Sequence, residues 1–137
     1  MLEIGKTYET LLTPHIHSKS PTIPFYSSVT AELISTPGSL DASYWRDNLE
    51  KPVLFNAAIE RSIKDHTGSR LFVEISANGN MKFLIRDFIR ARDNAPDFYI
   101  PAMSRGKNCD EQLLELIGEL FIRNIPINFD ILAPKPQ

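Results

Sequence analysis

The stretch Tyr44–Phe55 constrains the fold most, because a proline separates two runs of apolar residues that are spaced as in helices. Asp41 stands just before the first run and suits the N-cap of a helix. Pro52 has no backbone N–H and restricts Lys51 to extended geometry, so it cannot continue that helix. It can, however, be the first residue of a second helix over residues 52–66. The sequence therefore predicts two helices broken at Pro52.

The middle of the chain predicts an α/β fold. Leu71–Ile75 is a compact apolar run whose length and bounds indicate a buried, parallel strand. A tight turn at Ser76–Asn80 leads into residues 81–91, whose apolar positions recur at helical spacing. Together with the helix at 52–66, these segments form an α-β-α unit, as in layered α/β folds.

The two ends of the chain carry further elements. We expect a helix at Met1–Leu12, a strand at Ile23–Val29 and a short extended piece at Phe98–Pro101. Asn108 resembles the N-cap of a last helix, with an acidic residue at the third helical position as in a capping box. The apolar stripe of this helix extends to Phe121, and Pro126 is expected to stop it. Ile127–Ile131 is predicted to be extended.

Several side chains could be mistaken for chemical sites. His15 and His17 lie in a predicted loop with no third ligand nearby, so ordinary exposed histidines are favoured over a metal site. No glycine flanks Ser27 or Ser28, so the sharp Gly-x-Ser-x-Gly turn of a nucleophile is absent, and hydroxyls on a strand are favoured. Cys109 is the single cysteine, which rules out an internal disulfide and a cysteine-rich zinc cluster.

Charge and hydropathy exclude some partners. A formal net charge of −2 gives no reason to expect nucleic acid or an anionic membrane surface as partner. No apolar run approaches the roughly 20 residues of a spanning helix, and the N-terminus has no secretory pattern. We expect a cytoplasmic protein without a membrane partner.

The order Tyr-Trp-x-x-Asn-Leu-x-x-Pro-Val-x-Phe resembles the signature in the later half of polyketide synthase acyltransferase domains, most closely those of fungal type. Other stretches are similar to that family in the same order, namely Met1–Tyr8, Ile23–Thr30, Phe72–Ile75, Tyr99–Gly106 and Leu114–Ile127. The resemblance implies a partial, α/β-hydrolase-like acyltransferase core at residues 1–92, with a few-stranded, mostly parallel sheet flanked by helices. It implies a linker with one helix at residues 93–137.

The family transfers acyl groups with a Ser–His pair. The serine attacks a coenzyme A thioester, and the acyl group then passes to the phosphopantetheine arm of an acyl carrier protein. The resemblance places the serine far upstream and the histidine four residues before Met1. His15, His17 and His66 do not align with it. We therefore expect no catalytic, cofactor-binding or metal-binding residue in this chain, and no activity from the chain alone.

Two positions are expected to support the site. In related enzymes a backbone carbonyl near the residue before Pro-Val orients the catalytic histidine, and that residue is Lys51 here. Ser76–Asn78 stand where the family usually has Gly, Pro and His in a turn that borders the active site, which suggests degeneration or altered use of that turn. Alternatively, Asn78 and Gly79 simply form a left-handed turn.

Two hypotheses follow. In the first, the chain is the C-terminal part of an acyltransferase domain with its linker, and its partners are the upstream half of that domain, the ketosynthase and the acyl carrier protein. In the second, it is a standalone, non-catalytic scaffold or carrier-docking module derived from that domain. Because a sheet of few strands has unpaired edges, we also expect exposed apolar surface and self-association.

Overall fold

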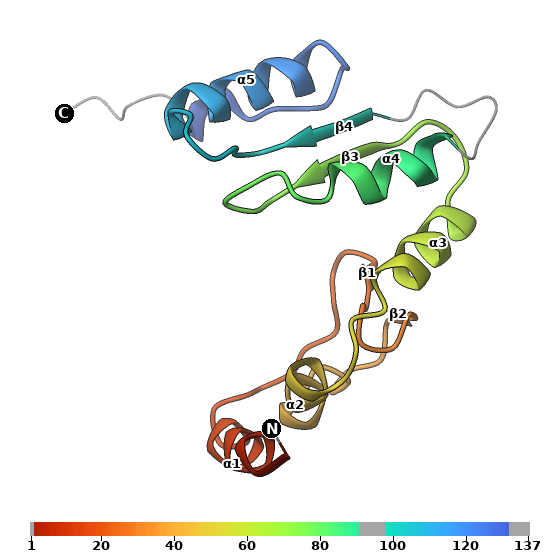
Figure 1. Cartoon of the computed structure of the whole chain (residues 1–137), viewed down its shortest axis with the longest axis vertical. Coiled ribbons are helices and arrows are strands. Elements are labelled where there is room, and N and C mark those ends of the chain that lie inside the picture. The colour runs from red at the N-terminus through yellow and green to blue at the C-terminus, as the bar shows by residue number, and fades with distance from the viewer. Residues whose placement is uncertain (1, 91–97, 132–137) are drawn as a thin grey trace. The chain divides into compact units, whose positions relative to one another are not determined.

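The computed structural model describes residues 2–90 and 98–131 of the 137-residue chain. The protein is α/β and divides into two compact units, Met1–Thr67 and Gly68–Gln137. Figure 1 traces both units along the chain, and each is taken by itself below. No helix in the described ranges is long and apolar enough to cross a membrane.

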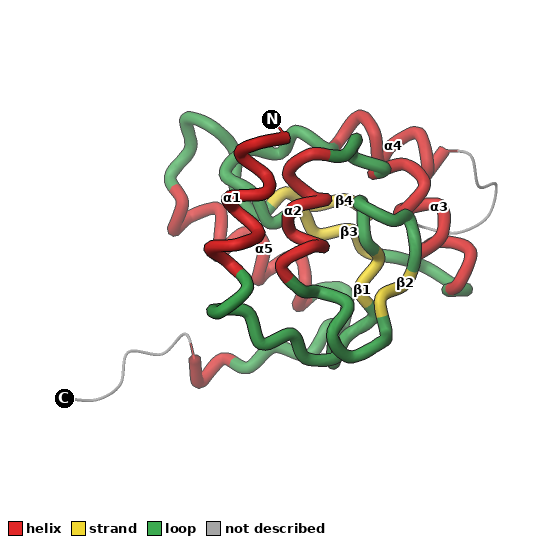
Figure 2. The backbone as a smooth tube through the Cα atoms, turned by 90° about the horizontal axis from the view of Figure 1, so that it is seen from below, coloured by secondary structure: helices red, strands yellow, loops and turns green. Residues whose placement is uncertain are grey.

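The first unit is built around a pair of helices. It contains the elements α1 (Leu2–Leu12), β1 (Phe25–Tyr26), β2 (Leu33–Ile34), α2 (Ala42–Glu50) and α3 (Phe55–Asp65). Helices α1 and α2 pack against each other, and Figure 2 shows them side by side. Asp41 caps α2 as predicted, because its side chain accepts a hydrogen bond from the Tyr44 N–H at 2.9 Å.

The strand predicted at Ile23–Val29 is wrong in length. Only Phe25–Tyr26 is a strand, and it pairs antiparallel with Leu33–Ile34. At Ser27 the backbone turns, because the side-chain Oγ accepts hydrogen bonds from the N–H groups of Val29 and Thr30 at 3.0 and 3.2 Å. These local hydrogen bonds compete with strand pairing and end the strand early.

The start predicted for the second helix is also wrong. Lys51 is extended, with φ −86° and ψ 156°, as the following proline requires. Pro52 nevertheless stays outside α3, which begins at Phe55. The Leu54 N–H donates to the Ser28 carbonyl at 2.6 Å. This tertiary hydrogen bond holds residues 52–54 out of helical geometry.

The second unit centres on a parallel pair of strands. It contains β3 (Leu71–Glu74), α4 (Lys82–Arg90), β4 (Phe98–Pro101), α5 (Cys109–Phe121) and the 3₁₀ turn η1 (Phe129–Ile131). β3 pairs with β4 in parallel, which confirms the parallel strand, and α4 falls inside the predicted range. Asn108 caps α5 as predicted, accepting from the N–H groups of Asp110 and Glu111 at 2.9 and 3.2 Å.

Two expectations for this unit are wrong. The strand is not fully buried, since Val73 is 36% and the flanking Ile75 86% exposed. The reason is that the sheet has two strands within the described residues, so each strand is an edge. The extended stretch at Ile127–Ile131 instead ends in the turn η1, where the Phe129 ring meets Phe121 edge-on with centroids 5.9 Å apart.

The boundary predicted between residues 92 and 93 stays a prediction. The polar stretch 91–97 and the tail 132–137 lie outside the described residues.

Candidate functional site

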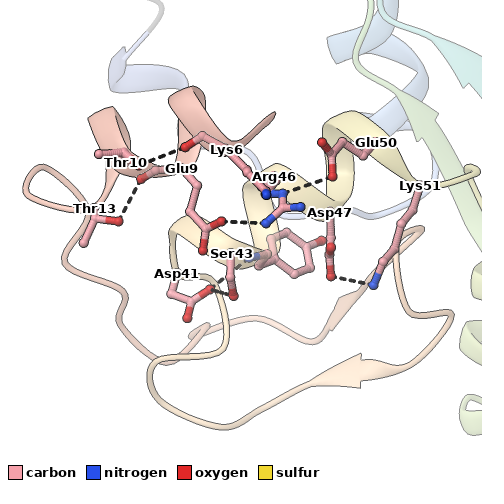
Figure 3. Close-up of polar contacts among 11 residues, drawn as sticks. Lys6, Glu9, Thr10, Thr13, Asp41, Ser43, Arg46, Asp47, Glu50 and Lys51 are labelled. Atoms are coloured by element: carbon pink, nitrogen blue, oxygen red, sulfur yellow. Dashed lines mark hydrogen bonds and ion pairs between the residues drawn. The ribbon is translucent and has the colours of Figure 1, made fainter. Parts of the chain in front are cut away.

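An ion-pair cluster joins α1 to α2. Arg46 on α2 donates from Nη1 to Glu9 on α1 and from Nε to Glu50 on its own helix, both at 3.0 Å. Figure 3 shows the guanidinium between the two carboxylates. The hydrogen bond to Glu9, followed in size by the one to Glu50, raises the pKa of Arg46, so the guanidinium stays charged. The Glu50 side chain is only 11% exposed, so the cluster is shielded on that side.

A glycine lets the two helices approach closely. A Cβ at Gly5 would lie 2.5 Å from Cδ of Glu50 and closer still to its Oε1. That Oε1 is buried and has no hydrogen-bond partner among the described residues. Since Gly5 faces Glu50 while Glu9 faces Arg46, the two helices run antiparallel. The first turn of α1 therefore lies beside the last turn of α2.

Lys51 follows directly at that end. Its N–H donates to the Asp47 carbonyl at 2.8 Å, and its Nζ pairs with the Asp47 carboxylate at 2.7 Å. Within the part of the chain that the structure describes, no backbone or side-chain donor reaches the Lys51 carbonyl. Pro52 keeps this carbonyl in extended geometry, out of the helical hydrogen-bond ladder. The acceptor directly follows Glu50, whose carboxylate lies against Gly5 in the first half of α1.

The turn after β3 is organised by Glu74. Its carboxylate accepts from Ser76 Oγ at 2.6 Å, from the backbone N–H groups of Asn80 and Met81 at 3.1 and 2.9 Å, and from the Tyr99 hydroxyl. Burial by itself would raise the pKa of Glu74, but these hydrogen bonds outweigh it, and the pKa is lowered. Burial and the bond to Glu74 raise the pKa of Tyr99. Glu74 thus satisfies backbone donors at the start of α4.

Asn78 holds the same turn from its other side. Its Nδ2 donates to Asn80 Oδ1 at 2.8 Å, and its Oδ1 accepts from the Arg105 N–H at 3.3 Å. The alternative of a left-handed turn is wrong, since neither Asn78 nor Gly79 has a positive φ. Gly79 is needed for space instead, because a Cβ there would lie 2.8 Å from Cβ of Pro101. Lys51 and Asn78 belong to different units, so each contributes to its own local geometry.

The other candidate residues show no reactive arrangement. His15 and His17 are exposed, and no group of three or more His, Cys, Asp or Glu side chains within residues 2–90 and 98–131 could hold a metal ion. Ser27 is fully buried and shares a hydrogen bond with the Tyr44 hydroxyl at 2.9 Å, so it is structural. His66 Nδ1 lies 2.9 Å from the Ser62 carbonyl at the end of α3.

Sequence reasoning missed the contact between Gly5 and the Arg46–Glu50 pair. The pair itself has a sequence signal, because Arg and Glu four residues apart meet on a helix face. The partner Glu9 is 37 residues away from Arg46 and has no such signal. Glu74 was noted only as part of a resembling strand.

Known proteins match nearly the whole chain. The family model described as acyl transferase domain matches residues 3–125. A highly reducing polyketide synthase of Glarea lozoyensis is 45% identical over 98% of this chain and 5% of that protein. One of Alternaria alternata is 40% identical over the same shares. The chain thus spans about 5% of the length of these relatives.

A solved structure supports the same fold. The acyltransferase domain from the second module of the salinomycin polyketide synthase superposes with a TM-score of 0.77 over 94% of this chain and 28% of that chain, at 16% identity. At 16% sequence identity, this match shows only that the two proteins share an α/β fold. Taken with the family match over residues 3–125 and the fungal relatives, it leads to one conclusion: the chain belongs to the acyl transferase domain family of polyketide synthases.

Proposed function

We propose that the chain is the C-terminal part of the acyltransferase domain of a fungal-type, highly reducing polyketide synthase. The complete domain would load acyl or malonyl units from coenzyme A thioesters onto the phosphopantetheine arm of an acyl carrier protein. The nucleophilic serine and the catalytic histidine come from sequence upstream of this chain. The observation that carries the proposal is the available Lys51 carbonyl beside the first turn of α1.

The carbonyl has a defined role in this chemistry. The family's catalytic histidine belongs four residues before Met1, and α1 runs antiparallel to α2. The chain that leads into α1 therefore enters beside the end of α2. An imidazole there donates its Nδ1–H to the Lys51 carbonyl, which fixes the tautomer and leaves Nε2 to accept the serine proton.

The reaction then proceeds in two balanced halves. The serine oxygen attacks the thioester carbonyl, its proton passes to Nε2, and the coenzyme A thiol leaves with that proton. In the second half, the carrier thiol gives its proton to Nε2 and attacks the serine ester. The serine oxygen then leaves and takes that proton back from Nε2, which restores both groups. The Lys51 carbonyl stabilises the imidazolium in both halves, and no side chain is needed at that position.

The turn at Asn78 contributes shape rather than a reactive group. Its amide bonds to Asn80 and to the Arg105 backbone, while Glu74 fixes the preceding strand end. An amide at this position does not titrate near neutral pH, unlike the histidine usual in the family. We propose that this turn keeps a fixed, neutral geometry within the second unit.

The test is a fusion that restores a whole domain. The upstream part of the acyltransferase domain from the Glarea lozoyensis relative is joined to this chain, and loading is measured with labelled malonyl- and acetyl-coenzyme A and a carrier protein. We expect a covalent acyl-enzyme and transfer to the carrier, and no adduct on this chain alone. The matched control joins the same upstream part to the relative's own segment. If the control loads and the folded fusion does not, the proposal fails, and a non-catalytic scaffold becomes the better description.

A further inference from the structure

We propose that Gly5, Arg46 and Glu50 act as positioning residues, forming a clamp that sets the start of α1 at a fixed place relative to the Lys51 carbonyl. This inference rests on the proposed function and deepens it. The clamp touches neither substrate nor the reacting atoms. It acts through the backbone at the two ends that it joins.

The first argument is the closeness of the contact. The Glu50 carboxylate lies against the bare Cα of Gly5 on one side and is held by Arg46 Nε at 3.0 Å on the other. Arg46 is in turn held by Glu9, one turn further along α1, at 3.0 Å. The carboxylate therefore cannot move away from α1 without losing its ion pair. Any side chain at position 5 would have to displace it.

The second argument is the place of the clamp in the chain. Glu50 is the last residue of α2, and the next residue is Lys51. Gly5 lies in the first half of α1, on the face toward α2. A displacement of Glu50 relative to Gly5 thus changes the distance between the Lys51 carbonyl and the chain that enters α1.

The third argument is that packing alone does not need this clamp. The buried Oε1 of Glu50 has no donor among the described residues, which is unfavourable for a carboxylate. Replacing a shielded ion pair by well-packed apolar side chains is often neutral or stabilising. An ion pair and a close backbone contact that fix two helix ends against each other are suited to orienting a catalytic group.

The experiment uses the fused, complete domain described above. Gly5→Ala inserts a methyl group into the clamp, and Glu50→Gln removes its charge while keeping its shape. Two matched controls lie on α5: Gly118→Ala, where a Cβ would meet nothing within 4 Å, and Glu119→Gln, whose carboxylate also pairs with an arginine four residues away. All four variants are compared for kcat, KM and the pH dependence of kcat/KM.

We expect Gly5→Ala to lower kcat by about 10- to 100-fold with KM within about twofold of the parent, because a small misplacement of a catalytic group costs that much. Glu50→Gln should have the same effect in weaker form. The acid limb of the pH profile should move to lower pH in both, because a poorly placed carbonyl stabilises the imidazolium less. The two controls should match the parent in all three readouts.

The outcomes separate the two proposals. If Gly5→Ala and Glu50→Gln only reduce the fraction of active enzyme, and the acid limb of the kcat/KM profile does not move, the clamp is only structural. That result would overturn the inference while the proposed function stands. Equal behaviour of Gly5→Ala and Gly118→Ala would overturn it as well. A parent fusion that fails to load acyl groups, beside a control domain that loads them, would overturn both proposals.

Discussion

Replacement of Gly5 by alanine should destabilise the first unit, although alanine is the better helix former. In a helix interior, Gly→Ala gains about 0.5–1 kcal/mol from backbone entropy. At Gly5 the new methyl group overlaps the Glu50 carboxylate. Inserting a methyl group into such a packed contact costs about 1–3 kcal/mol. Expelling Glu50 also weakens its pair with Arg46, so we expect a net loss of about 1–2 kcal/mol.

The assay is urea denaturation followed by tryptophan fluorescence. Trp45 is the single tryptophan and lies on α2 next to Arg46, so its signal reports the unit that contains the clamp. The midpoint for Gly5→Ala should fall. Gly118→Ala lies in the second unit and should leave the Trp45 midpoint unchanged, while helical circular dichroism shows a small gain in stability for it.

A double-mutant cycle locates the cause. Glu50→Ala removes the atoms that a methyl group at position 5 would meet, so adding Gly5→Ala in that background should be neutral or stabilising. If Gly5→Ala is equally destabilising with and without the Glu50 carboxylate, or if it stabilises the chain as much as Gly118→Ala does, the contact argument is refuted.

Three further predictions concern other parts of the chain. The pKa of Glu74 is lowered in the folded protein, so the stability that its carboxylate contributes is present above its unfolded pKa and is lost as the pH falls through the folded value. The Glu74→Gln variant has no such carboxylate. Thermal melts below about pH 4 should therefore show a smaller acid-induced loss of stability for this variant than for the parent. In the fused domain, Lys51→Ala should keep its loading activity because only the carbonyl is used, whereas Pro52→Ala lets residue 51 become helical and should lower the loading rate; equal rates would contradict the role of the carbonyl. The chain alone exposes large apolar side chains, such as Ile4 at 63% and Phe83 at 67%, and should bind a hydrophobic dye and self-associate, whereas monodisperse light scattering without dye binding would contradict this.

Elements whose signals are local were predictable from the sequence. The caps at Asp41 and Asn108 bond to backbone groups two or three residues away, so the residue types alone indicate them. The apolar stripe of α4 is local in the same way, and the short apolar run of β3 indicated a strand of parallel type without revealing its distant partner β4. The extended backbone of Lys51 was predictable because a proline restricts the residue directly before it, whereas its supporting role was implied by the resemblance to the acyltransferase family.

Features that depend on distant partners were not predictable. Ser27 leaves the expected strand for a turn, and it is also tied to Tyr44, 17 residues away. Leu54 stays out of the helix because of Ser28, which no pattern near position 54 reveals. In the candidate site, the sequence shows Gly5 only as an unfavourable residue within a helix. The structure explains the glycine, because the Glu50 carboxylate occupies the space that a side chain at position 5 would need.

At Lys51 the two kinds of information meet. The direction of its carbonyl follows from Pro52, a rule that acts on neighbouring residues. The location of that carbonyl relative to α1 follows from the contact between Gly5 and Glu50, which spans most of the first unit. A hydrogen bond to an incoming imidazole needs both, because hydrogen-bond strength depends on angle as well as on distance. A substitution at Pro52 should therefore change the direction of the Lys51 carbonyl, and a substitution at Gly5 should change its position. Both substitutions should lower the loading rate, each through a different part of the hydrogen-bond geometry. The side chain at position 51 remains free to vary.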